Sequence, residues 1–350
     1  MPLRRTAASA AALLTLTVGG LTATTATTAY AADGTPPGQE KPGHYSFAVI
    51  GDVPYGADQV AKFPSWIDQI NAAKPAMTFH VGDIKNGSSR CDNAYYTMIR
   101  TDFNRFVGPL IYTPGDNEWT DCHRVNNGAY NPLERLAYDR SVFFDQPGTT
   151  LGQHPITVKS QVNAGFPENV QLRRHDVEFA TIHVVGSNDD LQPWTGIGYK
   201  TATPEQIAEE RARMANAIAV VRDTFAQATR RHDRAVMVMQ QADMFDPTYT
   251  PNYATDLSAY QPLVQALVDE SAKFDGQVYL INGDSHVYNS DQPLAAGSKW
   301  LTTYGVTGSA NNLQRITVDG SSNNKDWLRF TITRPGAAQV LTWERVPYTS

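Results

Sequence analysis

The sequence is poor in three features, and each scarcity excludes a class of protein. Only two cysteines occur among 350 residues, which excludes a scaffold built on several disulfides. The apolar run near the N-terminus is far shorter than the ~20 residues that a bilayer-spanning helix needs. Lys and Arg number 29 against 35 Asp and Glu, a net charge of −6, so no polyanion-binding surface of the nucleic-acid type is evident.

The remaining composition is that of a globular protein. Hydrophobic residues make up 41% and aromatic residues 10% of the chain, which argues against disorder. The length allows one large domain or two small ones. No internal repeat and no second domain boundary are evident, so we expect a single domain over residues 44–350.

The first 43 residues carry the features of an exported protein. Arg4 and Arg5 precede an apolar stretch that ends in Ala29-Tyr30-Ala31, a small-x-small cleavage pattern. We therefore expect a signal peptide over residues 1–31, followed by a Pro/Gly-rich linker over residues 32–43. The expected protein is secreted, with no membrane span after cleavage; a membrane anchor is the alternative.

The two cysteines, Cys91 and Cys122, favour a disulfide over a metal site if the protein is secreted. Such a bridge would close a loop of about thirty residues and stabilise the fold by roughly 3–4 kcal/mol in the chain-entropy model. Two unrelated buried thiols are the alternative.

Apolar runs alternate with amphipathic segments, which predicts an α/β domain with helices packed on a sheet. The expected strands are Tyr45–Ile50, Met77–Val81, Leu110–Tyr112, Val177–Val185, Ala235–Met239 and Val278–Ile281. One helix is expected to begin at a capping box at Thr203, a second to cover residues 258–274, and residues 327–346 to form a hairpin.

Four apolar runs are followed by glycine and aspartate, and these pairs carry the chemistry. In open α/β sheets ligands bind beyond the carboxyl ends of the strands, where these side chains would converge. Four carboxylates in one place repel one another and are costly to bury. Bound cations resolve that conflict, so the pattern predicts a metal centre. The aspartates are Asp52, Asp83, Asp116 and Asp284.

The ordered motifs resemble those of calcineurin-like metallophosphoesterases, which include the purple acid phosphatases. The resemblance spans about residues 45–290 and implies a layered sheet sandwich flanked by helices. Asp52 matches the first aspartate of that family, and Asp83 the carboxylate that bridges its two metals. Residues 114–118 (PGDNE) stand where the family has P-G-N-H-E, and residues 283–286 (GDSH) where it has G-H-x-H.

The sequence departs from the family at most histidine positions. Pro54 and Asp284 each replace a ligand histidine, and Asp116 replaces a ligand asparagine. Asn117 replaces the histidine that assists phosphate binding and leaving-group protonation. Gln240-Gln241 lies where a further ligand histidine belongs, which makes Gln241 a candidate ligand, and of the family's histidines only His286 remains.

Three alternatives follow from these replacements. In the first, oxygen donors replace the family's nitrogen donors, and one or two divalent ions bind to Asp52, Asp83, Asp116, Asp284 and His286. In the second, one metal site survives and the other is lost. In the third, the protein binds metal or phosphate without turnover. An oxygen-rich ligand set favours Mn, Mg, Ca or Fe over Zn.

Further residues near the motifs are candidates for the same site. Tyr55, three residues after Asp52, is a possible ligand, because purple acid phosphatases use a tyrosine three residues after the aspartate of their second motif; packing or hydrogen bonding is the alternative. His123 or Arg124 can supply the proton donor or phosphate clamp that Asn117 no longer provides. The alternative for His123 is a solvent-facing loop position.

These features predict a secreted, metal-dependent phosphoesterase that hydrolyses phosphate mono- or diesters with metal-activated water. The expected partner is a small-molecule phosphate ester, and the oligomeric state is not predicted. An inactive metal- or phosphate-binding extracellular protein on the same fold is the alternative.

Overall fold

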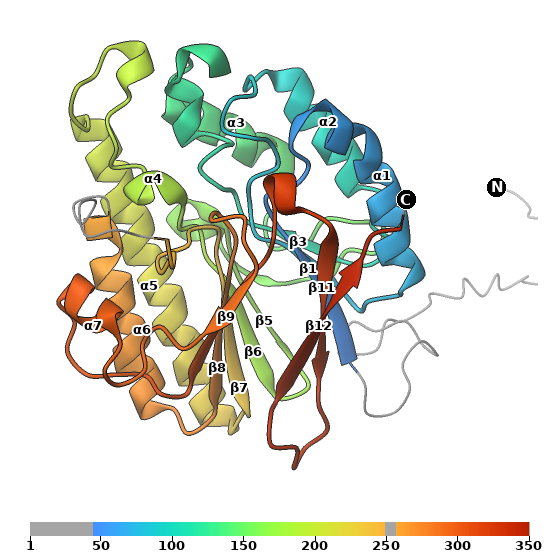
Figure 1. Cartoon of the computed structure of the whole chain (residues 1–350), viewed down its shortest axis with the longest axis vertical. Helices are drawn as coiled ribbons and strands as arrows, with labels where there is room; N and C mark the ends of the chain where they lie inside the picture. The colour runs from blue at the N-terminus through green and yellow to red at the C-terminus, as the bar shows by residue number, and fades with distance from the viewer. Residues whose placement is uncertain (1–44, 249–256, 350) are drawn as a thin grey trace, which may run out of the picture.

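Two β-sheets form the middle of the molecule in the computed structural model, which describes residues 45–248 and 257–349 (Figure 1). The expected signal peptide over residues 1–31 and the linker over residues 32–43 lie outside the described residues. Within the described part, no helix is both long and apolar enough to cross a membrane.

The first sheet has five strands in the order β12-β11-β1-β2-β3. Strand β1 runs parallel to β2, and β2 parallel to β3, whereas β11 pairs antiparallel with both β1 and β12. The hairpin expected in the C-terminal tail is therefore confirmed, and it extends the sheet at β1. The strands are β1 (Tyr45–Ile50), β2 (Thr78–His80), β3 (Leu110–Tyr112), β11 (Asp326–Ile332) and β12 (Leu341–Pro347).

The second sheet has seven strands in the order β4-β5-β6-β7-β8-β10-β9. Its centre, from β6 through β7 and β8 to β10, is parallel, and antiparallel strands close both edges. The strands are β4 (Lys159–Gln161), β5 (Phe166–Arg174), β6 (Val177–Thr181), β7 (Ala235–Met239), β8 (Gln277–Asn282), β9 (Asn289–Asp291) and β10 (Leu313–Thr317).

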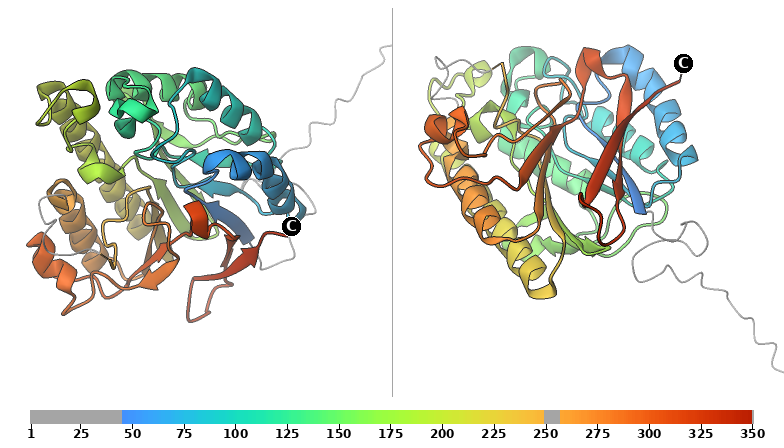
Figure 2. Two further views of the ribbon diagram at one scale, coloured as in Figure 1. Left: turned by 45° about the horizontal axis from the view of Figure 1, so that its top comes forward. Right: turned by 60° about the horizontal axis from the view of Figure 1, so that its bottom comes forward.

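The two sheets pack face to face, and helices cover their outer faces (Figures 1 and 2). Helices α1 to α3 share a core cluster with the first sheet, and α5 to α7 share another with the second. Between the sheets, Phe47, Phe79 and Phe179 pack with ring centroids 5.4–5.8 Å apart. The helices are α1 (Gly56–Ala72), α2 (Asn93–Phe103), α3 (Pro132–Phe143), α5 (Pro204–Arg231), α6 (Gln261–Lys273) and α7 (Lys299–Tyr304).

Local sequence explains the element boundaries nearest the site. Strand β1 alternates between two cores, because Phe47 and Val49 face the second sheet while Ile50 faces the helices. Helix α5 begins at the expected capping box, in which the Thr203 hydroxyl accepts from the Gln206 N–H and the Gln206 side chain accepts from the Thr203 N–H.

Strands β2 and β6 are shorter than expected, and the difference is larger in β6. Strand β6 ends at Thr181 rather than at Val185. Beyond that point the chain stays extended but bonds irregularly, with the Ile182 N–H donating to the Met239 carbonyl and the Ala242 N–H to the Val184 carbonyl. The strand gives way here to the turn labelled α4 (Gly186–Asp189), which borders the site.

Candidate metal centre

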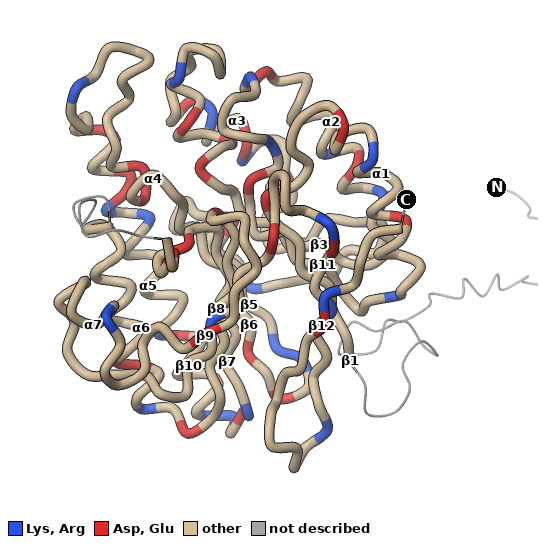
Figure 3. Tube along the Cα trace, in the orientation of Figure 1, with Lys and Arg blue, Asp and Glu red and all other residues tan. Residues whose placement is uncertain are grey.

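The expected strand-end aspartates lie directly after β1, β2, β3 and β8. Three of them turn the chain sharply, with φ of 52° at Asp52, 60° at Asp83 and 74° at Asp284. Aspartate tolerates this left-handed backbone better than most residues. In Figure 3, acidic positions gather where these strands end, in the middle of the picture.

Two groups of side chains in this region have the spacing of metal ligands. Ligand atoms of Asp52, Asp83 and His286, here called the histidine site, lie within 4.8 Å of one another. The same holds for Asp83, Asp116 and Asp284, here called the oxygen site. Asp83 belongs to both sites, and a carboxylate with two oxygens can bridge two adjacent cations. The structure thus brings together these five residues selected from the sequence.

The surroundings of these carboxylates oppose their ionisation. Burial, together with repulsion from the neighbouring carboxylates, raises the pKa of Asp83 well above its usual range. Burial likewise raises the pKa of Asp116 and that of Asp284. A cluster of this kind keeps protons unless positive charge replaces them, and divalent cations supply such charge. The residues present therefore fit a metal centre.

His286 completes the histidine site from the loop after β8. Its Nε2 lies 3.4 Å from Asp52 Oδ1 and 3.3 Å from the Tyr55 hydroxyl. Burial opposes protonation of the ring, but the Asp52 carboxylate outweighs burial and raises the pKa of His286. The ring therefore contacts both Asp52 and the Tyr55 hydroxyl, which in turn donates to Asp83.

Tyr55 and Asn117 both bind the shared carboxylate. The Tyr55 hydroxyl donates to Asp83 Oδ2 at 2.7 Å, and Asn117 Nδ2 donates to the same oxygen at 2.8 Å and to the Tyr55 hydroxyl at 2.7 Å. Burial, reinforced by the nearby carboxylates, raises the pKa of Tyr55 well above its usual value. Tyr55 is thus a neutral hydrogen-bond donor in this arrangement, with its oxygen at the edge of the histidine site.

Gln241, after β7, lies beside the oxygen site. Its Nε2 is 3.3 Å from Asp83 Oδ2 and 3.4 Å from Asp116 Oδ1, while its Oε1 accepts from the Gly186 N–H at 2.7 Å. The amide nitrogen therefore faces the carboxylates, and the amide oxygen is hydrogen-bonded to the α4 turn.

The glycines of the Gly-Asp pairs are needed for close approach between strands. A Cβ at Gly115 would lie 2.1 Å from Asp83 Oδ1, and a Cβ at Gly283 would lie 2.2 Å from Asp52 Oδ2. Each glycine therefore makes room for the carboxylate of a neighbouring strand. Glycines that served only to form turns would not need to leave this space.

Glu118 and Lys85 do not belong to the strand-end Gly-Asp pairs, but they contact the loops that carry Asp83 and Asp116. The Glu118 carboxylate accepts the N–H groups of Ile84 and Gly115 and so ties together the loops that carry Asp83 and Asp116. Burial raises the pKa of Glu118 to about 7. Lys85 is fully buried and donates to the Asn117 carbonyl at 2.9 Å. Glu118 is the last residue of the third motif and Lys85 follows the second, but the sequence does not indicate these contacts.

The Cys91–Cys122 disulfide is present, with its half-cystines 31 residues apart in sequence. It fixes the short helix η1 (Thr120–His123), which follows the third motif. Arg124 leaves this helix with its guanidinium bound to Asp121 Oδ1 at 2.6 Å and to the Gly87 carbonyl at 3.1 Å. A Cβ at Gly87 would lie within 3.0 Å of both Asn117 Oδ1 and Arg124 Nη1, so these two side chains border the same space.

His123 is buried, so the alternative of a solvent-facing loop position is excluded. Its Nδ1 accepts the N–H of Gly196, a residue of the short helix η4 (Thr195–Ile197). Burial, together with the charge of Arg124, lowers the pKa of His123 to about 4. The ring is therefore neutral near neutral pH.

Solved structures similar to this one include two phosphatases. A dimetal phosphatase from Danio rerio matches with a TM-score of 0.51 at 9% identity, over 87% of this chain and 99% of that one. The GAP50 anchor of the Plasmodium inner membrane complex matches with a TM-score of 0.46 at 9% identity, over 88% and 90%. A purple acid phosphatase from yellow lupin (Lupinus luteus) matches with a TM-score of 0.44 at 12% identity, over 89% and 53%.

No family model and no curated protein sequence matches the chain. The structural likeness establishes the fold: the chain has the metallophosphoesterase fold, with two mixed sheets flanked by helices, as the motifs predict.

Proposed function

We propose that this protein is a secreted, metal-dependent phosphoesterase that hydrolyses phosphate mono- or diesters at a two-cation centre. The observation that carries the proposal is that Asp83 belongs to both the histidine site and the oxygen site. Two adjacent cation sites are an arrangement that stabilises both the attacking and the leaving oxygen of an in-line displacement at phosphorus.

The two sites differ in donor chemistry. Three carboxylates make up the oxygen site, which favours Mn, Mg or Ca. The histidine site adds an imidazole to two carboxylates and also suits Fe or Zn. When bound, the cations lower the pKa of water and neutralise charge on the phosphate.

The other proposed roles belong to side chains around Asp83. Tyr55 and Asn117 orient Asp83 through hydrogen bonds, and both lie at the histidine site. We assign phosphate contact to Asn117 and Arg124, because Asp121 and the Gly87 carbonyl hold the guanidinium beside the Asn117 amide. Because its pKa is lowered, His123 would serve as a neutral hydrogen-bonding group rather than as a cationic acid.

The test combines metal content with turnover. Purified protein is analysed for bound elements and assayed on aryl phosphate mono- and diesters with Mn, Fe, Zn, Mg or Ca. Asp83→Asn should lose both metals and turnover. Asp139→Asn, which changes a fully buried aspartate of α3, is the matched control and should lose neither. Wild-type protein without metal and without turnover under all conditions would refute the proposal.

A second candidate is a metal- or phosphate-binding extracellular protein without turnover. One observation favours it: Tyr55 and Asn117 occupy Asp83 Oδ2, an oxygen that a bridging ligand would offer to a cation. Stoichiometric metal with turnover no higher than that of Asp83→Asn would support this candidate. Secretion is tested separately, since export should yield a mature N-terminus at residue 32.

A further inference from the structure

The turn beside the oxygen site has a backbone that few sequences adopt. Four consecutive non-glycine residues are left-handed, with φ of 57° at Ser187, 56° at Asn188, 54° at Asp189 and 71° at Asp190. Asn and Asp tolerate a left-handed backbone better than most residues, but they adopt it mostly singly, and serine adopts it less readily. Strain of this kind persists only where the surroundings hold it, and it concentrates at functional sites.

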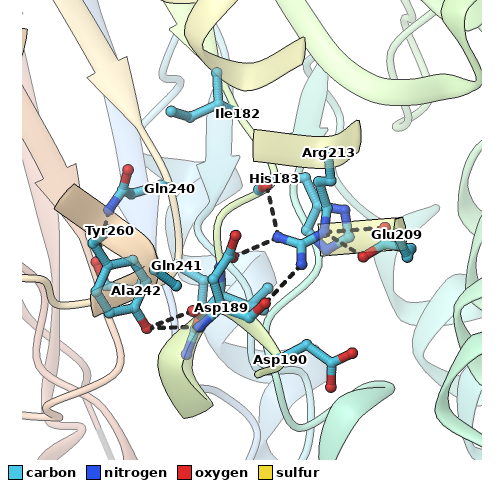
Figure 4. A network of polar contacts seen from close by, with 12 residues as sticks. Ile182, His183, Asp189, Asp190, Glu209, Arg213, Gln240, Gln241, Ala242 and Tyr260 are labelled. Carbon is cyan, nitrogen blue, oxygen red and sulfur yellow. Dashed lines mark hydrogen bonds and ion pairs between the residues drawn. The ribbon is translucent and has the colours of Figure 1, made fainter. Parts of the chain in front are cut away.

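A buried arginine from helix α5 holds this turn (Figure 4). Arg213 is fully buried, and its guanidinium donates to a carboxylate oxygen of Asp189 and, at 3.0 Å, to the Asp189 carbonyl. Glu209, one turn earlier in α5, binds the other side of the guanidinium at 3.0 Å. Arg213 thus binds both the side chain and the backbone of one left-handed residue.

A second set of bonds fixes the turn at its two ends. The Tyr260 hydroxyl donates to the Val185 carbonyl at 2.7 Å and accepts the Asp189 N–H at 3.2 Å. At the far end, Trp194 Nε1 donates to Asp190 Oδ1 at 3.0 Å. These partners come from separate segments, so the conformation of the turn is determined from several sides.

The turn directs two donors toward the oxygen site. The Ser187 hydroxyl donates to Asp116 Oδ2 at 2.9 Å. The Gly186 N–H donates to the Gln241 amide oxygen at 2.7 Å, which aims the amide nitrogen at Asp83 and Asp116. A Cβ at Gly186 would lie 2.6 Å from Asp116 Oδ2, so the turn is in direct contact with the ligand set.

We propose that Ser187 is a positioning residue of the oxygen site and that Arg213, through Asp189, keeps it in place. By donating to Oδ2 of Asp116, Ser187 fixes the orientation of this carboxylate, whose Oδ1 would remain available to a cation. Hydrogen bonds of this type orient ligating carboxylates, and their loss usually weakens metal binding 10- to 100-fold. The inference rests on the proposed metal centre.

The decisive variant is Ser187→Gly, because glycine removes the hydroxyl while relieving the left-handed backbone. Mn²⁺ is titrated into metal-free protein and followed by calorimetry and by electron paramagnetic resonance. The affinity of one of two Mn²⁺ ions should fall 10- to 100-fold, while the midpoint of thermal unfolding of the metal-free protein stays equal or rises. A purely structural role of Ser187 predicts unchanged affinity.

Two further variants serve as references. His286→Ala should weaken the other Mn²⁺ ion, which assigns the ion affected by Ser187→Gly to the oxygen site. Lys74→Gly relieves a left-handed backbone (φ 52°) at an exposed position after α1 and should leave both affinities unchanged.

A double variant tests the part played by Arg213. If Arg213→Lys acts through Ser187, then Ser187→Gly combined with Arg213→Lys should lose no more Mn²⁺ affinity than Ser187→Gly alone. Additive losses would overturn the role of Arg213. Two Mn²⁺ ions bound equally by wild type and Ser187→Gly would overturn the role of Ser187, and a wild type that binds none would overturn the metal centre as well.

Discussion

At the scale of single residues, the geometry of the centre depends on glycines, which have no side chain, as much as on the aspartates. Gly115 and Gly283 belong to the strand-end motifs, yet each leaves space for an aspartate of another strand. The carboxylates approach one another because no Cβ intervenes. The positions of the candidate ligands are therefore coupled across strands. A methyl group added at one of these glycines should displace an aspartate of the centre.

Gly115→Ala tests this coupling. The added Cβ would lie 2.1 Å from Asp83 Oδ1 and 2.6 Å from the Asp83 nitrogen, both inside van der Waals contact. We expect a loss of about 1–3 kcal/mol in the free energy of unfolding and loss of metal binding at both sites. Gly108→Ala is the control, because its Cβ would meet nothing closer than 3.5 Å. Urea unfolding and metal titration of the two variants should differ clearly; equal behaviour would contradict the coupling.

A second residue-scale prediction concerns pH. Burial, together with the charge of Asp189, raises the pKa of Glu210 in α5 to about 7. A carboxyl group whose pKa is higher in the folded state destabilises the protein progressively as pH rises from about 4.5 toward 7. Glu210→Gln should remove that cost. The variant should therefore exceed wild type by about 1 kcal/mol in unfolding free energy at pH 8, allowing for solvent screening, and gain nothing at pH 5.

Urea unfolding at the two pH values measures this difference. Glu205→Gln, at an exposed position in the first turn of the same helix, is the control for loss of an acidic group from α5. Parallel pH profiles of wild type and Glu210→Gln would contradict the prediction.

The aspartates could be found from the sequence because each follows a strand within a few residues. Asp52 and Asp83 lie two and three residues after the ends of the parallel strands β1 and β2, and parallel strands bring such positions to one edge. Ser187 and Glu118 could not be found in this way. Ser187 reaches Asp116 from a turn that is left-handed from Ser187 to Asp190, and that conformation is held in part by Arg213, 26 residues later in the chain.

At the scale of elements, the disulfide joins the loop that carries Arg124 to the segment before α2. Replacing both Cys91 and Cys122 by serine removes a constraint on a loop of 31 residues. We expect the free energy of unfolding to fall by about 3–4 kcal/mol, because the unfolded chain regains the entropy of that loop. Urea unfolding of the oxidised wild type and of the double variant gives the difference; a loss below about 1 kcal/mol would contradict it.

The elements that could be predicted are those whose pattern of apolar residues reflects how they are buried in the fold. Strands β7 and β8 are apolar on both faces because each lies between parallel neighbours, and both were expected nearly as observed. Edge strands β4 and β9 have three residues each and polar sequences, so no apolar pattern marks them. The α4 turn could not be foreseen, because none of its left-handed residues is glycine.

At the scale of the whole molecule, the division into two sheets decides where the site lies. The side chains of the histidine site come from both sheets, because Asp52 and Asp83 follow strands of the first and His286 follows a strand of the second. The order of apolar runs in the sequence does not reveal that division, since it depends on the C-terminal strand β11 returning to pair with β1. The resemblance to the family's motifs predicted a layered sheet sandwich, which the periodicity of apolar residues alone could not.

The shared burial of the carboxylates makes stability of the whole molecule depend on metal and pH together. Burial raises the pKa values of Asp83, Asp116 and Asp284. The metal-free protein should therefore lose stability as pH rises above about 4, the usual carboxyl pKa. Bound Mn²⁺ replaces those protons, so its stabilising effect should grow over the same pH range and reach about 2.7 kcal/mol per site at one hundred times Kd. Thermal unfolding at pH 5 and 7.5, with EDTA or with Mn²⁺, should show opposite pH trends in wild type, and Asp83→Asn should respond to neither addition.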